Sequence, residues 1–239
     1  MKTIKLLSIT LFSALLFLSS IVQAAQSGNN KQTRTVSEFH GISVSSGIDL
    51  YLTQKNIQEV RVEADEEAME NLITEVEGGI LKIYMKEKSW LQFNWNHASC
   101  KVYVSFKTLD KLEASAGSDV ASQSVLNLDK LDLDASSGAD VKLELNASEV
   151  NAGSSSGSDI VLKGKAISFQ VDASSGSDIN AADFQTKKCN ASVSSGSDIQ
   201  VYVTEQLDAH ASSGGDIEYS GNPAQKEIQK SSGGGVQSR

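Results

Sequence analysis

A short serine-glycine-aspartate stretch recurs along this chain at nearly constant intervals. It reads SSGSDI three times, at 155–160, 174–179 and 194–199, with close variants elsewhere. From one turn glycine to the next, the spacings are 21, 19, 19, 20, 18 and 19 residues for Gly117, Gly138, Gly157, Gly176, Gly196, Gly214 and Gly233. A fixed period in this range is typical of a solenoid, in which each repeat stacks on its neighbours.

The residues between the turns alternate between apolar and polar, as strands with one buried face do. Positions three, five and seven before each glycine are mostly small or apolar. The position three after it is Val120, Val141, Ile160, Ile179, Ile199 or Ile217. This alternation has a period of two, and no repeat has helical periodicity. The sequence therefore predicts an all-β solenoid, a parallel β-helix whose coils of ~19 residues stack about 4.8 Å apart.

The recurring turn is expected to form one corner of each coil. Glycine adopts a positive φ that other residues resist. The flanking serine and aspartate side chains can hydrogen-bond the backbone of their own turn. Every coil would then have an equivalent corner built from the same residue types.

The period is interrupted between Gly47 and Gly117, where the sequence predicts a first coil and an N-terminal cap. The stretch 65–76, DEEAMENLITEV, predicts a short α-helix that Asp65 begins and Gly78-Gly79 ends. Its apolar face would comprise Met69, Leu72, Ile73 and Val76. Strands are expected at 59–63, 80–86 and 101–106. A cap of this kind would protect the open edge of the first coil.

The expected organisation has four parts. Residues 1–24 have two early lysines, an apolar stretch and a Val22-Gln23-Ala24 cleavage pattern, which together predict an export signal peptide. A retained signal anchor is the alternative. Residues 25–37 are expected to be a flexible segment and 38–223 a single β-helix domain, with first coil and cap at 38–111 and regular coils at 112–223. Residues 224–239 are expected to terminate the solenoid, because Pro223 removes a donor and Lys230 takes a core position.

The charge balance restricts the partners of the chain. There are 21 basic and 30 acidic residues, a formal net charge of −9, and only three arginines. Such a surface repels nucleic acid and anionic lipid. No other long apolar run follows the signal, so we expect an exported protein with no transmembrane segment in the mature chain.

The aspartate two residues after each turn glycine is the first candidate site. In register, these residues form a column of carboxylates that repel one another by roughly 0.9 kcal/mol per adjacent pair in water. Turn-backbone donors and serine hydroxyls could offset this repulsion, and no cofactor would then be needed. The alternative is a ladder of Ca²⁺ ions, with Asp159, Asp178 and Asp198 as candidate ligands. The basic opposite corner, with Lys163, Lys165, Lys187 and Lys188, argues against a calcium-binding β-roll.

Three aromatic residues and two cysteines are further candidates. Trp90, Phe93 and Trp95 could pack on the cap, or could form a platform for a sugar or a partner protein. Cys100 and Cys189 are expected several coils apart, about 19 Å along the stack, which exceeds the reach of a disulfide. Two buried free thiols are therefore predicted.

The order of these motifs resembles the head GIN domain family, whose members are described as auto-transporter adhesin heads of exported bacterial proteins. The resemblance covers about residues 34–223 and includes FHGISVSSGIDLYL, ITEVEGGILKIYM, the series of G-S-D-I turns and GGDIEYSGNP. It implies a right-handed, mostly parallel β-helix and an exported, adhesive role. It implies no catalytic residue.

Two functions remain open from the sequence. The first is an exported binding or adhesion module of the cell envelope, in the periplasm or at the cell surface, with a glycan or an envelope or matrix protein as partner. The second is a carbohydrate-active β-helix enzyme that acts on a polysaccharide through the aspartates. No metal-ligand spacing, nucleophile elbow or phosphate loop is present in the sequence, which favours the first. The sequence does not indicate an oligomeric state.

Overall fold

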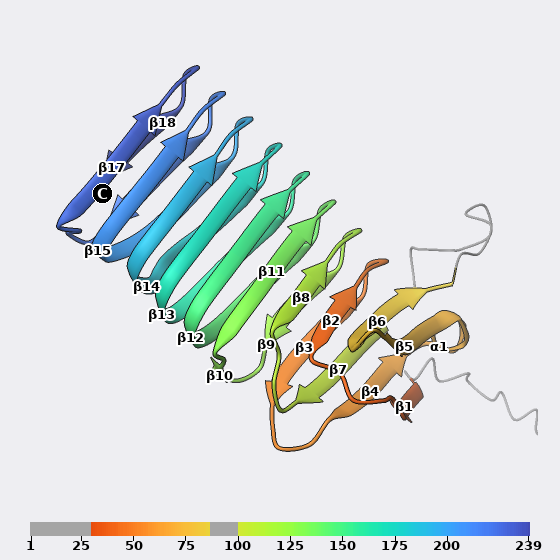
Figure 1. Ribbon diagram of the computed structural model, residues 1–239. Coiled ribbons are helices and arrows are strands. Elements are labelled where there is room, and N and C mark those ends of the chain that lie inside the picture. The colour runs from red at the N-terminus through yellow and green to blue at the C-terminus, as the bar shows by residue number, and fades with distance from the viewer. Residues whose placement is uncertain (1–29, 87–99) are drawn as a thin grey trace, which may run out of the picture.

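The structure is a computed structural model that describes residues 30–86 and 100–239. Strands stack side by side along one axis, from the N-terminal cap to the C-terminal coil (Figure 1). Adjacent coils pair as parallel strands throughout the regular part. The predicted all-β solenoid of coils of about 19 residues is confirmed.

The regular part is built from strands that lengthen toward the middle. The four longest are β12 (Asp140–Ser155), β13 (Asp159–Ser174), β14 (Asp178–Val193) and β15 (Asp198–Ala211). They follow β8 (Lys111–Ala114), β9 (Asp119–Ser122), β10 (Leu126–Asn127) and β11 (Lys130–Ser136). They precede β16 (Asp216–Ser220), β17 (Gln225–Lys230) and β18 (Gly235–Ser238). Each long strand runs from one serine-glycine corner almost to the next.

The predicted inward columns form the core. Ile160, Ile179 and Ile199 lie in register in consecutive coils, and each is at most 1% exposed. Phe169 and Phe184 pack against each other in the interior, with ring centroids 5.4 Å apart in an edge-to-face arrangement. Full burial of one such side chain stabilises by about 1.5–3 kcal/mol. Because each column is continuous, this burial depends on the neighbouring coils.

Two consecutive residues at each corner have positive φ, where the sequence indicated only the glycine. In one corner φ is 57° at Ser156 and 70° at Gly157. A Cβ on Gly157 would meet nothing within 4 Å, so the backbone conformation, and not crowding, requires the glycine. The glycine N–H donates to the serine carbonyl of the next coil, for example from Gly176 to Ser195 at 3.2 Å. The corners are thus hydrogen-bonded to one another.

The serine after the turn glycine is buried in four coils and ties them together. Ser118, Ser158, Ser177 and Ser197 are all 0% exposed. The Ser177 hydroxyl lies 2.8 Å from the Ser154 carbonyl oxygen of the preceding coil, and the Ser197 hydroxyl accepts from the Ser177 N–H at 3.1 Å. These buried hydroxyls therefore have partners, as buried polar groups require.

The N-terminal part covers the first coil. The strands β2 (Gly41–Val44) and β3 (Asp49–Gln54) pair in parallel with β8 and β9 and form the first coil. The strands β1 (Asn30–Arg34), β4 (Glu59–Ala64) and β7 (Cys100–Phe106) lie beyond it, and β4 is antiparallel to both of its neighbours. This change to antiparallel pairing ends the solenoid at its N-terminal side.

The prediction of a helix over 65–76 is wrong for the second half of this stretch. Helix α1 spans only Glu66–Asn71, and the Asp65 carboxylate accepts from the Ala68 N–H at 2.8 Å, as a helix N-cap does. Strand β5 (Leu72–Glu77) then pairs antiparallel with β6 (Ile80–Met85). Gly78 and Gly79, with φ of 60° and 80°, close this hairpin. The β-branched residues of β5 and the pairing with β6 outweigh the helical spacing of the apolar residues.

Residues 224–239 add one more coil at the C-terminal end. Strand β17 pairs with β15, and β18 pairs with β16. Every side chain of β17 is exposed, and Lys230 lies in register with the buried Ala211. Lysines on an edge strand discourage further strand pairing.

Candidate functional site

The seven turn aspartates form one column in register, as the sequence predicted. The pairings run from Asp49 through Asp119, Asp140, Asp159, Asp178 and Asp198 to Asp216. Their side chains lie on the outside of the corner. Gly235 takes the next place, so the aspartate column ends one coil before the strands do.

The pKa values of three turn aspartates are raised. Partial burial, and then the carboxylates of adjacent coils, raise the pKa of Asp119, Asp159 and Asp198 above the ordinary value. The Asp178 N–H donates to the Asp159 carboxylate and opposes the rise. The Asp198 N–H donates likewise to Asp178 at 3.2 Å. The backbone of the next coil therefore supplies part of the expected compensation.

The calcium ladder through Asp159, Asp178 and Asp198 stays a prediction. Within residues 30–86 and 100–239, no group of three or more His, Cys, Asp or Glu side chains is arranged to hold a metal ion. Ca²⁺ takes six to eight oxygen ligands. Each corner contributes one carboxylate, so two adjacent corners and several waters would have to complete a site.

We expect Asp159→Asn to raise the melting temperature at pH 7 by about 1–2 °C. The pKa of Asp159 is raised in the folded chain, so above the usual value of 3.8 the folded state binds more protons than the unfolded state. The free energy of unfolding therefore falls as pH rises through that window, and ionised Asp159 is destabilising at pH 7. Asparagine keeps an acceptor for the Asp178 N–H and removes the charge.

Thermal melts at pH 7 and pH 3 check this prediction. The gain should vanish at pH 3, where the aspartate is protonated. Asp183→Asn, on an exposed carboxylate outside the column, is the control and should give no gain. A lower melting temperature for Asp159→Asn at pH 7 would show that the carboxylate stabilises the corner.

Millimolar Ca²⁺ and a chelator should give melting temperatures within about 2 °C of each other. Backbone N–H groups already contact the carboxylates, which lowers the gain from a cation. A ligand that binds only the folded state stabilises it by RT ln(1 + [L]/Kd). A rise of about 10 °C that Asp159→Asn with Asp178→Asn abolishes would assign the column to metal binding.

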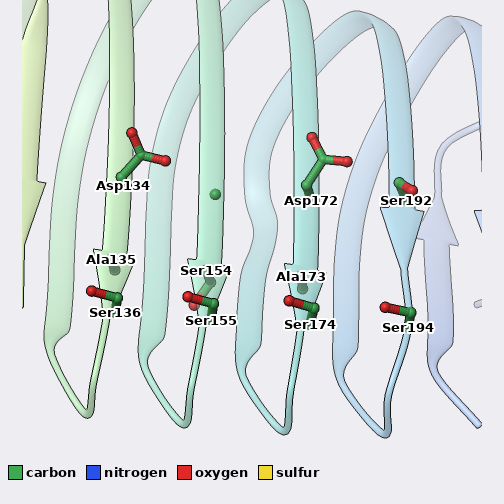
Figure 2. Close-up of a pocket in the computed structure, with 11 residues that line it drawn as sticks. Asp134, Ala135, Ser136, Ser154, Ser155, Asp172, Ala173, Ser174, Ser192 and Ser194 are labelled. Atoms are coloured by element: carbon green, nitrogen blue, oxygen red, sulfur yellow. The ribbon is translucent and has the colours of Figure 1, made fainter.

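A shallow polar groove lies beside the corner, on β11, β12, β13 and β14 (Figure 2). Its volume is about 330 Å³. Four serines that precede the turns line up along it and present their hydroxyls in the same direction: Ser136, Ser155, Ser174 and Ser194. We call this the polar groove.

A missing side chain shapes the polar groove. Asp134, Gly153 and Asp172 lie in register in three consecutive coils, and Gly153 leaves a gap between the two aspartates. A Cβ on Gly153 would lie 2.8 Å from an oxygen of Asp134, so the carboxylate leans over the glycine. Partial burial, and then Glu113, raise the pKa of Asp134. Carboxylates and hydroxyls around a gap can hydrogen-bond the hydroxyls of a ligand.

This groove is not among the sites expected from the sequence, although the sequence carries a signal for it. The position four before the turn glycine carries Glu113, Asp134, Asp172 and other polar residues, and Gly153 interrupts that series. An outward-facing glycine within a strand marks a place where a ligand or another backbone can approach closely.

The other candidates from the sequence are three aromatic residues and two cysteines. Trp90, Phe93 and Trp95 lie outside the described residues. Cys100 and Cys189 are both buried and free, which confirms two buried thiols. Burial, and then Asp49 and Asp65, raise the pKa of Cys100 to about 12, and burial raises the pKa of Cys189. Neither is a reactive thiolate at neutral pH.

Residues 38–223 match a family model described as "Putative auto-transporter adhesin, head GIN domain". The chain belongs to this family. The match confirms the resemblance drawn from the corner motifs, and it includes the aspartate column and the polar groove. None of the curated proteins matches the chain.

Solved structures of similar proteins share the fold of this GIN domain. A crystal structure described as a putative adhesin from Bacteroides fragilis has a TM-score of 0.80 at 20% identity, over 88% of this chain and 96% of that one. A putative adhesin from Parabacteroides distasonis has a TM-score of 0.71 at 21% identity, over 90% and 98%. A protein from the same species, described as a putative lipid binding protein, has a TM-score of 0.65 at 22% identity, over 90% and 98%.

Proposed function

We propose that this GIN domain is an exported binding module of the cell envelope, which attaches to a glycan or to an envelope or matrix protein without altering it chemically. The polar groove is the observation that carries the proposal. Its serine hydroxyls and two aspartates are held on paired strands at regular spacing and are open to solvent. Membership of the adhesin head family supports the same function.

The rigidity of the groove favours binding to a repetitive polar surface. Strands that are hydrogen-bonded on both sides hold the donors and acceptors in place before a ligand arrives, so little conformational entropy is lost on binding. Each hydrogen bond contributes about 0.5–1.5 kcal/mol net. A shallow groove of this kind suits modest affinity that several simultaneous contacts increase.

Export is part of the proposal. The features of residues 1–24 support it, and these residues lie outside the described ranges. Among the described residues, no helix is long and apolar enough to cross a membrane. The periplasm and the cell surface both satisfy the proposal.

Hydrolysis of a polysaccharide is the second candidate, and the aspartate pair of the polar groove favours it. Asp134 and Asp172 flank Gly153 two strand spacings apart, so their Cα atoms lie about 9–10 Å from each other. The Asp134 carboxylate leans over Gly153, which brings it closer to Asp172 than the Cα separation. Inverting glycosidases hold their two carboxyl groups roughly 6.5–9.5 Å apart. The raised pKa of Asp134 is the direction that a general acid needs.

The description of one structural neighbour suggests lipid binding as a function, but the packed core of this domain argues against it. Phe169, Phe184 and Leu162 fill the interior and are at most 1% exposed. An acyl chain would need an apolar cavity, whereas the polar groove is shallow and carries two carboxylates. We therefore favour a hydroxyl-rich ligand.

An array of glycans and matrix proteins, probed with residues 25–239, tests the proposal. We expect retention of at least one ligand class, and its loss in Gly153→Asn, which fills the gap between the aspartates. Gly153 does not have a positive φ, and the neighbouring Asp134 carboxylate can move, so the variant should fold. Gln225→Asn, at an exposed position on β17 outside the groove, is the control. Equal retention by Gly153→Asn, or no retention at all, would contradict the proposal.

A further inference from the structure

A second groove lies away from the serine-glycine corners, where β12, β13, β14 and β15 bend. Its volume is about 280 Å³. The lining residues include Lys165 and Lys187 and, within this described part of the chain, no carboxylate. We call it the basic groove. It stands out in a chain whose net charge is −9.

Small side chains create the basic groove. Ala147, Ala166 and Thr186 lie in register in three consecutive coils and form its floor. The residues before them, Asn146, Lys165 and Gln185, form a second register that makes one wall. Ile167 and Lys187, which follow the floor residues, make the other wall.

Backbone geometry fixes the position of Lys165. The preceding Gly164 has φ of 110°, and a Cβ there would lie 2.0 Å from the Leu145 carbonyl oxygen. Two coils therefore approach closely at this point, which only glycine permits. The strand that carries Lys165 is held firmly against its neighbour, while the lysine side chain extends into solvent.

The two lysines are available to an anion. Lys165 has no ion pair among the described residues. Lys187 Nζ lies 3.1 Å from Glu205 Oε1, and both side chains are more than half exposed. An exposed pair of this kind contributes only ~0–1 kcal/mol, so a ligand carboxylate can replace Glu205. Lys163 and Lys188 extend the positive charge beyond the rim, and Asp183 near Lys163 (3.9 Å) offsets part of it.

On the wall opposite Lys165, Ile167 adds an apolar surface beside Lys187. Ile167 is 54% exposed and adjoins the buried Ala166. The groove thus combines two cations, two amide side chains and an aliphatic surface. The C–H face of a sugar ring can lie on such a surface while the amides hydrogen-bond its hydroxyls.

We propose that the basic groove binds an acidic sugar, such as a uronic acid unit of a polysaccharide, through Lys165 and Lys187 with Ile167 against the ring. Its volume lies just below the range of ~300–1,000 Å³ for small-molecule pockets, so it suits one sugar ring. A long acyl chain has no enclosed cavity to enter here. This site is separate from the polar groove and does not depend on the proposed adhesive function.

Isothermal titration of residues 25–239 with an oligogalacturonate tests the site. We expect a dissociation constant in the high micromolar to millimolar range that rises with salt, because lysines provide the attraction. Lys165→Gln with Lys187→Gln should weaken binding at least tenfold. Lys55→Gln with Lys107→Gln removes the same charge from exposed lysines near the cap and should leave binding within twofold.

Two further probes distinguish the ligand chemistry. A neutral galacto-oligosaccharide and inorganic phosphate should each bind at least tenfold more weakly than the oligogalacturonate. Binding that the Lys165→Gln/Lys187→Gln variant retains, or that phosphate or the neutral sugar matches, would overturn the proposal. Loss of binding in Gly153→Asn would place the acidic sugar in the polar groove and would also overturn it.

Discussion

Ile179→Asp is expected to unfold several coils together and to lower the melting temperature by roughly 10 °C or more. Ile179 is 1% exposed and lies in register between Ile160 and Ile199. An aspartate there has no cation in the apolar column, so it must be buried uncharged or force the coil open. The cost should reach about 4 kcal/mol or more. Because each coil is stabilised by its neighbours, the loss should spread along the stack.

Circular dichroism melts measure this effect, with Asn180→Asp as the control. Asn180 is the next residue and faces solvent, so the same charge on the outer face should change the melting temperature by only about 1–2 °C. Similar melting temperatures for Ile179→Asp and the wild type would show that the isoleucine column does not face a packed interior.

Gly164→Ala should destabilise the domain by roughly 3–5 kcal/mol, through both backbone strain and a steric clash. At φ of 110° an alanine is strained, and its Cβ would lie 2.0 Å from the Leu145 carbonyl oxygen. That oxygen belongs to the backbone of the adjacent coil, so it cannot rotate away. Either the register between β12 and β13 shifts or the coils separate locally.

Gly157→Ala is the matched control, because φ there is also positive, at 70°, but nothing lies within 4 Å of the added carbon. It should cost only about 1–2 kcal/mol, the strain of a left-handed conformation. Urea denaturation of the two variants measures the difference. Equal costs would mean that the close approach of the two coils at Gly164 is not required for stability.

The repeat could be predicted from the sequence because each recurring residue type meets a single structural requirement at its position in the coil. Ile160, Ile179 and Ile199 recur because the interior accepts only apolar side chains, and Asp159, Asp178 and Asp198 recur because every corner has the same backbone. Period and alternation together therefore indicate strand direction, register and core.

The parts that could not be predicted depend on contacts between segments. Leu72–Glu77 has helical spacing of apolar residues, but pairing with β6 makes it a strand. The positive φ of Ser156 follows from the geometry of the whole corner, and a serine in the sequence does not predict a positive φ. Gly153 leaves a gap because aspartates flank it in the adjacent coils, and Ala166 lies on a groove floor because Ala147 and Thr186, in register beside it, are also small. The sequence reveals this arrangement only when the register is known.

The central claim is that this domain binds a ligand without cleaving it, and one experiment measures both the binding and the cleavage. Residues 25–239 are dialysed to equilibrium against defined oligosaccharides, both neutral and uronic acid-containing, and the bound amount and chain-length distribution are recorded. We expect binding to at least one oligosaccharide, with every chain recovered at its original length. Shortened chains that appear with the wild type, and not with Asp134→Asn, would contradict the claim and identify the aspartate pair as catalytic.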